Sequence, residues 1–124
     1  MSIAFKPDLH VSAAKAFKGD ATLHNPEDLL LSSLASCHFM SYLYCCEQHN
    51  IEVVSYSDQA EAILEVHPDG SGQITQAILR PKVLIANASQ KQLALDLHQK
   101  ANQLCFIANS CNFEVVHQAT CEVL

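Results

Sequence analysis

The segment NPEDLLLSSLASCHFMSYLYCC, residues 25–46, constrains the fold of this chain more than any other stretch. Asn25 is a favoured helix N-cap, and a proline follows at the first helical position. Glu27 and Asp28 come next, where the helix dipole favours negative charge, and Asp28 can complete a weak form of the capping box. We therefore predict a helix that begins after Asn25 and runs to about Gln48.

This predicted helix is apolar on nearly every side, so most of its surface has to be covered. The chain has 124 residues, which is enough for one domain, 1–124, with a modest core. Hydrophobic residues make up 49% of it, so some apolar surface is expected to be buried against a second copy. Ser32, Ser33 and Ser36 interrupt the apolar run, which argues against a membrane span.

Charge and cysteine content exclude several classes of function. The net charge is −6, Lys and Arg total 7, and no basic run occurs, so neither nucleic acid nor a membrane surface is an expected partner. The first ten residues do not resemble a signal peptide, and we expect a cytoplasmic location. Six cysteines without a C-x-x-C pair then predict reduced thiols, with no metal site.

After residue 50 the apolar pattern changes from helical spacing to alternation. HPDGSG has the composition of a hairpin turn, and Ser89 could cap a second helix. One or two short strands are expected within the first 24 residues. The order predicts an α+β fold, with two helices packed on a mostly antiparallel sheet. The expected elements after the first helix are strands at 51–56, 59–67 and 73–86, a helix at 90–108 and a last strand at 113–124.

Cys37 lies in the middle of the first helix and is the first candidate for chemistry. A nucleophilic cysteine needs a lowered pKa, because the thiolate is the reactive form. Cys37 is twelve residues past Asn25, about 18 Å along the axis, and the dipole effect fades within the first turn. Burial alone would raise the pKa. A cation or hydrogen-bond donor from outside this helix is therefore required, and otherwise Cys37 is an inert core residue.

Cys105, near the end of the second predicted helix, is the second candidate. Packed helices have axes about 8–10 Å apart, so inward-facing cysteines at one level could meet at disulfide distance. One thiol could then react and the other resolve the product. Cys111 is the best rival for the resolving role. The remaining thiols are interpreted as packing residues: Cys45, Cys46 and Cys121.

These two cysteine segments resemble the OsmC/Ohr family of thiol-dependent peroxidases. HNPEDLLLSSLASCHFMSYL is similar to the family's central helix, and HQKANQLCFIANS followed by FEV is similar to its second cysteine segment. The similarity covers about residues 17–117. It implies an intertwined homodimer with active sites at the interface, in which organic hydroperoxides are reduced. It also implies that Cys37 is the peroxidatic cysteine, Cys105 the resolving one and Glu27 the supporting helix-start glutamate.

The chain departs from the family pattern in its cations. Family peroxidases usually carry an arginine in the loop before the first helix, where it lowers the thiol pKa and pairs with the glutamate. Here that loop has only Lys15 and Lys18, and the single arginine of the chain is Arg80, in a predicted strand. A lysine lacks the bidentate fork that holds a carboxylate in place. Lys18 or Arg80 is the expected partner of Glu27.

Three histidines could also contribute to a site. His38 follows Cys37, but neighbouring residues on a helix point about 100° apart, so direct cooperation is not favoured. His24 precedes the helix cap and could reach a cleft there, although an exposed loop histidine is the simpler interpretation. His98 is two turns, about 10 Å, from Cys105.

Three functions remain open on the sequence. The first is a peroxidase that uses no cofactor and takes electrons from an external dithiol. The second is a non-enzymatic protein of the same fold that binds an apolar ligand at the dimer interface. The third is a cysteine hydrolase, which would need a histidine base placed on Cys37 by the fold.

Overall fold

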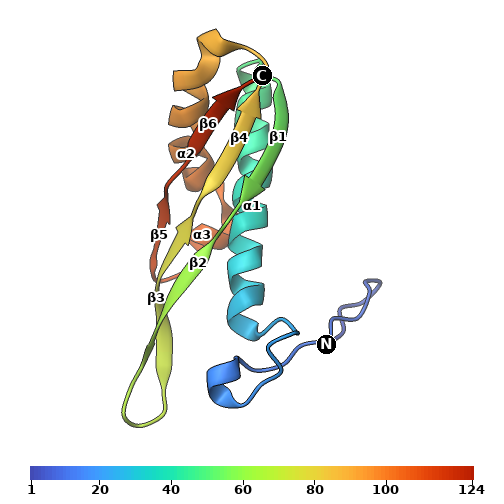
Figure 1. Ribbon diagram of the computed structural model, residues 1–124, viewed down its shortest axis with the longest axis vertical. Helices are drawn as coiled ribbons and strands as arrows, with labels where there is room; N and C mark the ends of the chain where they lie inside the picture. The colour runs from blue at the N-terminus through green and yellow to red at the C-terminus, as the bar shows by residue number, and fades with distance from the viewer.

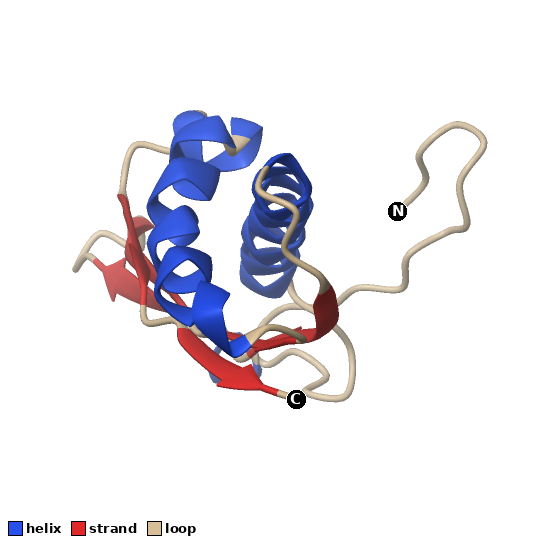
Figure 2. Cartoon of the chain, turned by 90° about the horizontal axis from the view of Figure 1, so that it is seen from above, coloured by secondary structure: helices blue, strands red, loops and turns tan.

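The computed structural model describes residues 1–124, and its elements form an α+β fold with the helices on one side of the strands (Figures 1 and 2). The fold class is therefore confirmed. The elements are η1 (Lys15–Phe17), α1 (Pro26–Gln48), β1 (Val53–Asp58), β2 (Glu61–Val66), β3 (Gly72–Leu79), β4 (Pro81–Ile85), η2 (Ala88–Gln90), α2 (Lys91–Leu104), α3 (Phe106–Asn109), β5 (Glu114–His117) and β6 (Thr120–Val123).

Helix α1 begins and ends where the sequence predicts. The Asn25 side chain accepts a hydrogen bond from the Asp28 N–H at 2.8 Å, and the Asp28 carboxylate accepts one from the Asn25 N–H at 3.0 Å. This reciprocal capping box satisfies two N–H groups at the helix start. By length and composition alone α1 could cross a membrane, but the core helix of a soluble protein meets the same criteria. One of its faces packs on α2 and the strands, as expected for a core helix.

The strands form two small mixed sheets, so the predicted single, mostly antiparallel sheet is wrong. Their orders are β1–β4–β6 and β2–β3–β5. The β1–β4 and β2–β3 pairs are antiparallel, whereas β3–β5 and β4–β6 are parallel. The predicted strand 73–86 is in fact two strands, separated at Arg80, and the predicted strand 113–124 is likewise two. The HPDGSG hairpin is confirmed, since it joins β2 to β3.

Arg80 lies where the two sheets meet and ties three chain segments together. Its N–H donates to the Asp58 carboxylate at 2.8 Å, and its guanidinium reaches the Glu61 carboxylate at 2.8 Å. The guanidinium also donates to the Gln118 side chain at 3.2 Å and to the Gln59 carbonyl at 3.4 Å. All of these partners lie at the interruptions between paired strands, so Arg80 stabilises the change from one sheet to the other.

The second long helix is shorter than predicted. Helix α2 ends at Leu104 because Cys105 adopts an extended conformation, with φ −75° and ψ 110°, and the short helix α3 then begins. Ser89 is not its cap: it lies in η2, and Gln90 occupies the N-cap position. The first 24 residues contain no strand, only η1 and one bridge between Val11 and His24.

The core lies between the helices and the sheets, and α1 contributes only part of its surface. Val83 and Ile85 are buried as predicted, but Leu64 and Val66, also predicted to face inward, are exposed. Met40 and Tyr44 on α1 remain largely exposed in the single chain. The main cluster of buried residues is Tyr42, Cys45, Cys46, Ile51, Val83, Ile85, Ala94, Leu97, Ala101 and Cys121.

Candidate active site

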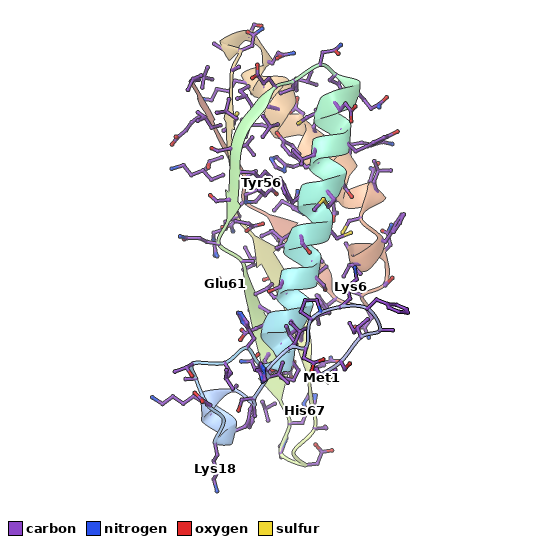
Figure 3. All side chains as sticks on the ribbon, turned by 90° about the vertical axis from the view of Figure 1, so that its right-hand side faces the viewer. Met1, Lys6, Lys18, Tyr56, Glu61 and His67 are labelled. Carbon is purple, nitrogen blue, oxygen red and sulfur yellow. The ribbon has the colours of Figure 1, made fainter.

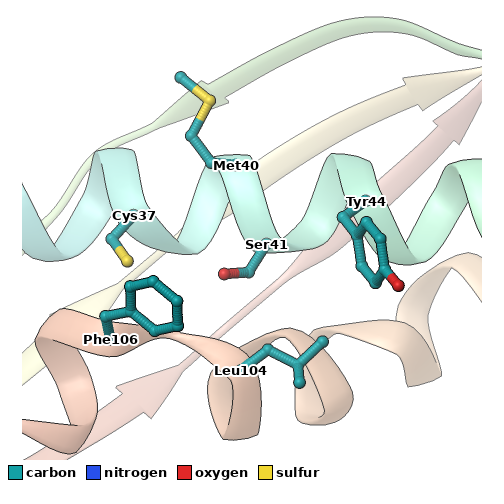
Figure 4. Close-up of a pocket in the computed structure, with 6 residues that line it drawn as sticks. All are labelled: Cys37, Met40, Ser41, Tyr44, Leu104 and Phe106. Carbon is teal, nitrogen blue, oxygen red and sulfur yellow. The ribbon is translucent and has the colours of Figure 1, made fainter.

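The structure brings Cys37 and Cys105 together at the break between α2 and α3. The Cys37 side chain points from α1 toward α3 and the end of α2 (Figure 4). Cys105 is at the break itself, where it is both the C-cap of α2 and the N-cap of α3. Because the chain turns at Cys105, the free N–H groups of the next residues are available to a partner on α1.

The surroundings of Cys37 lower the pKa of its thiol below the ordinary value. Partial burial acts in the opposite direction and would raise this pKa, but hydrogen bonds to the sulfur outweigh it. These hydrogen bonds therefore favour the thiolate more than the surroundings of an ordinary cysteine do. The groups that donate to it are the backbone N–H of Ile107, the Cys105 thiol, the backbone N–H of Phe106 and the Ser41 hydroxyl.

The pKa of the Cys105 thiol is shifted in the opposite direction. Burial, with a smaller contribution from the neighbouring Cys37, raises this pKa to about 11. Its sulfur accepts a hydrogen bond from the Ala108 N–H at 3.4 Å, which fixes the side chain at the start of α3. The site therefore pairs a thiol of lowered pKa with one that is protonated at neutral pH, and the Cys105 thiol is itself a hydrogen-bond donor to Cys37.

An apolar pocket of about 370 Å³ opens beside Cys37. The Ser41 side chain lies between the two helical segments, and the Phe106 ring faces Cys37 (Figure 4). A pocket of this lining can hold the organic part of a small molecule next to the sulfur. The lining residues are Cys37, Met40, Ser41, Tyr44, Leu104 and Phe106.

The predicted electrostatic support is not part of this pocket. Glu27 is at the start of α1, where it lines a different small pocket, and it has no salt-bridge partner in the chain. Lys18 points away from α1 at the far end of the molecule (Figure 3). Arg80 is engaged with Glu61 and does not pair with Glu27. The role of Glu27 stays a prediction.

His38 turns away from Cys37 and joins a buried group of imidazoles, as the helix geometry predicts. Its Nε2 is 3.0 Å from Nδ1 of His98, and the ring of His117 is 4.3 Å from its own ring. Burial and the neighbouring imidazoles lower the pKa of His38 to about 3, and burial with His117 lowers that of His98 to about 4. Both rings are therefore neutral at pH 7.

The other candidates lie outside the site. His24 is exposed and is 3.8 Å from the Asp28 carboxylate. Cys45, Cys46 and Cys121 are core residues, as predicted. Cys111 packs against the smaller apolar cluster around Leu34, and it remains half-buried beyond α3. No group of three or more His, Cys, Asp or Glu side chains is arranged to hold a metal ion.

Sequence reasoning missed the donors that stabilise the Cys37 thiolate. It required a cation or a donor from outside the helix, and the structure provides backbone N–H groups of Phe106 and Ile107. The interruption at Cys105 exposes these groups, but no proline or glycine there marks the interruption in the sequence. The apolar spacing of residues 90–108 is that of one continuous helix, so the interruption at Cys105 could not be seen in the sequence.

Comparisons with known proteins agree with the observed fold. The sequence profile of the family described as OsmC-like protein matches residues 19–119. A search of curated protein sequences found no significant match. Among solved structures, an OsmC-like protein of unknown function from Vibrio cholerae is 32% identical, with a TM-score of 0.74 over 82% of this chain and 68% of that one.

Two more distant structures share the fold. An OsmC-like protein from Mycoplasma pneumoniae has a TM-score of 0.80 at 15% identity, covering 97% of this chain and 86% of its own. The organic hydroperoxide resistance protein OhrB of Bacillus subtilis has a TM-score of 0.67 at 21% identity, covering 86% and 76% respectively.

Proposed function

Because this chain belongs to the OsmC-like protein family, we propose that it is a cysteine-based peroxidase that reduces organic hydroperoxides. The observation that carries the proposal is the pair of thiols: Cys37 with a lowered pKa, beside Cys105 with a raised one. The apolar pocket supports it, because an organic hydroperoxide has an apolar body next to its reactive oxygens. The related OhrB of Bacillus subtilis is an organic hydroperoxide resistance protein.

The first step is attack of the Cys37 thiolate on the terminal oxygen of the hydroperoxide. The S–O bond forms as the O–O bond breaks, the sulfur is oxidised by two electrons to a sulfenic acid, and the leaving alkoxide takes a proton to become the alcohol. The N–H groups of Phe106 and Ile107 lower the pKa of Cys37 and so increase the fraction of thiolate available for this reaction. A thiol reacts this way only as thiolate, so these donors replace the missing loop arginine.

The second step is condensation of the sulfenic acid with Cys105. The S–S bond forms, the S–O bond breaks, and the hydroxyl leaves with the Cys105 proton as water. Once Cys37 is a neutral sulfenic acid, its thiolate charge no longer raises the pKa of Cys105. An external dithiol then reduces the disulfide by thiol–disulfide exchange and regenerates both thiols.

Peptide mapping of the reduced protein after one equivalent of cumene hydroperoxide tests this function. We expect an intramolecular Cys37–Cys105 disulfide. A Cys37–Cys111 link would move the resolving role to Cys111. If other thiols are oxidised while Cys37 stays unmodified, the peroxidase function is excluded.

A second candidate function rests on the same pocket. Its lining is mostly apolar, and a protein of this fold could bind an apolar ligand there without chemistry, with the cysteines as wall residues. Blocking Cys37 with a small alkylating reagent separates the two. A binding protein loses affinity only in proportion to the lost volume, whereas a peroxidase loses all turnover.

A further inference from the structure

Two buried hydrogen bonds join α1 to α2. His38 Nε2 is 3.0 Å from His98 Nδ1, and the Tyr42 hydroxyl donates to the Ala94 carbonyl at 2.7 Å. His38 is 1% exposed and His98 is 4% exposed, so neither imidazole can exchange this bond for one with bulk water. The partners step in opposite directions along the two helices, as in an antiparallel pair. The His38–His98 bond lies one turn nearer to Cys37 and Cys105 than the Tyr42–Ala94 bond, so it is the closer restraint on how the two helices align at the thiols.

The rings of His38 and His98 both pack against other aromatic rings. The His117 ring lies 4.3 Å away, while His98 stacks on Tyr42 with 4.0 Å between centroids and 7° between planes. Nδ1 of His38 and Nε2 of His98 have no hydrogen-bond partner. The bond between the two rings is thus the only one that either imidazole makes, and rotating a ring would leave it with none.

Each histidine of this pair is on the same helical segment as one of the two thiols. Cys37 immediately precedes His38, and Cys105 follows His98 by two helical turns, about 10 Å. We infer that the His38–His98 hydrogen bond is a positioning device, which holds the Cys37 sulfur against Cys105 so that oxidation ends in a disulfide. The inference rests on the proposed peroxidase function only for the purpose that the alignment serves. The alignment of the two thiols itself can be measured without any peroxide.

The charge state of the pair supports this role. A hydrogen bond between two imidazoles needs one N–H donor and one bare nitrogen as acceptor, and two imidazolium ions would both be donors. The lowered pKa values, about 3 for His38 and about 4 for His98, keep both rings neutral through the working range of pH. The hydrogen bond between the two rings is therefore maintained at neutral pH.

The test is the equilibrium of the Cys37–Cys105 disulfide in glutathione redox buffers, on protein with the other four cysteines replaced by Ser or Ala. The variants are His98→Asn, whose amide can occupy the place of Nδ1, and His98→Leu, which cannot form the bond. The double variant His38→Leu/His98→Leu removes both polar partners, so that no imidazole is left unpaired if a single variant fails to fold. Tyr42→Phe is the matched control, because it removes the other buried bond between the same helices.

We expect His98→Leu and the double variant to lower the effective concentration of the two thiols by about 10- to 100-fold, the loss that follows a misplacement near 1 Å. His98→Asn should stay within about 3-fold of the parent, and so should Tyr42→Phe. The inference is overturned if the double variant keeps the parent equilibrium, if Tyr42→Phe loses as much as His98→Leu, or if the parent forms no Cys37–Cys105 disulfide.

A parallel reaction with cumene hydroperoxide separates the two proposals. If glutathione forms the disulfide in the parent but the peroxide leaves Cys37 unoxidised, the peroxidase function fails and the positioning role stands. If the peroxide oxidises Cys37 to sulfinic acid equally in the parent and in His98→Leu, the positioning role fails while the reaction with peroxide remains.

Discussion

The pKa of Cys37 is lowered by a backbone segment that is far away in the sequence. A thiol in the middle of a long apolar helix has no help from the dipole of that helix, and its own burial opposes ionisation. The N–H groups of Phe106 and Ile107 reverse this balance because the chain leaves the helical path at Cys105. The requirement for an outside donor was predictable from residue position, whereas the identity of the donor depended on tertiary structure.

At Cys37 we expect alkylation at a lower pH than at the four buried cysteines of the protein. The pKa of Cys37 is lowered, whereas burial raises those of Cys45, Cys46, Cys105 and Cys121. The rate of iodoacetamide labelling at Cys37, followed by peptide mass spectrometry across pH, measures this order. Labelling of Cys105 before Cys37 would contradict it.

The Cys105 thiol should contribute to that lowered pKa, since it donates a hydrogen bond to the Cys37 sulfur. Replacement Cys105→Ala removes this donor and leaves the backbone donors in place. The pKa of Cys37 should therefore rise in the variant while staying resolvable by the same labelling experiment. Cys111→Ala is the control and should leave the labelling profile of Cys37 unchanged.

At the scale of elements, the sequence correctly predicted the features that depend on interactions between residues close together in the chain. The capping box at Asn25 and Asp28 and the hairpin at HPDGSG depend on residues within a few positions of each other, and both were confirmed. Pro81 favours a bend or an edge within 73–86, whereas the Arg80 contacts at the division into β3 and β4 come from partners up to 38 residues away in the chain. The buried group of His38, His98 and His117 was not predicted, because each of these histidines comes from a different element.

Arg80 should matter for stability as the link between the two sheets. Replacement Arg80→Met keeps the aliphatic stem but removes the hydrogen bonds to Glu61 and Gln118. We expect a loss of about 1 kcal/mol in the free energy of unfolding, since the side chain is partly exposed and water screens the ion pair. Urea unfolding measures this loss. Arg80→Lys should lose nearly as much, because an ammonium cannot reach both partners as a planar fork.

The buried imidazoles make the fold sensitive to acid. The pKa values of His38 and His98 are lowered to about 3 and about 4 in the folded protein, against about 6.5 in an unfolded chain. Between these values the unfolded state binds more protons, so stability falls as pH falls from about 6.5 toward 4, by at most roughly 1.4 kcal/mol per pH unit for each histidine. The urea midpoint measured from pH 7.5 to 4.5 follows this slope. His98→Asn should flatten it, and an unchanged slope would contradict the assignment.

For the whole molecule, the single chain leaves apolar surface uncovered around the very pocket that contains Cys37. Met40 is 62% exposed, Tyr44 56% and Phe106 81%, and all three line that pocket. Contiguous exposed apolar surface of this kind is typical of a protein interface. Helix α1, which the sequence predicted to need covering on nearly every side, is buried by its own chain along one face only. A second copy of the chain is the simplest partner that could bury the other faces of α1.

We therefore expect an obligate homodimer that buries more than about 2,000 Å² in total and encloses the Cys37 pocket. Light scattering at micromolar concentration should give twice the chain mass of 13.6 kDa. Tyr44→Glu would bury an unpaired carboxylate at the interface and should shift the protein toward the monomer, because such a charge costs several kcal/mol. Gln99→Glu, on the exposed side of α2, adds the same charge and should leave the mass unchanged. A monomeric parent that still reacts with cumene hydroperoxide would show that one chain forms a complete site, and the exposed residues would then need a different partner.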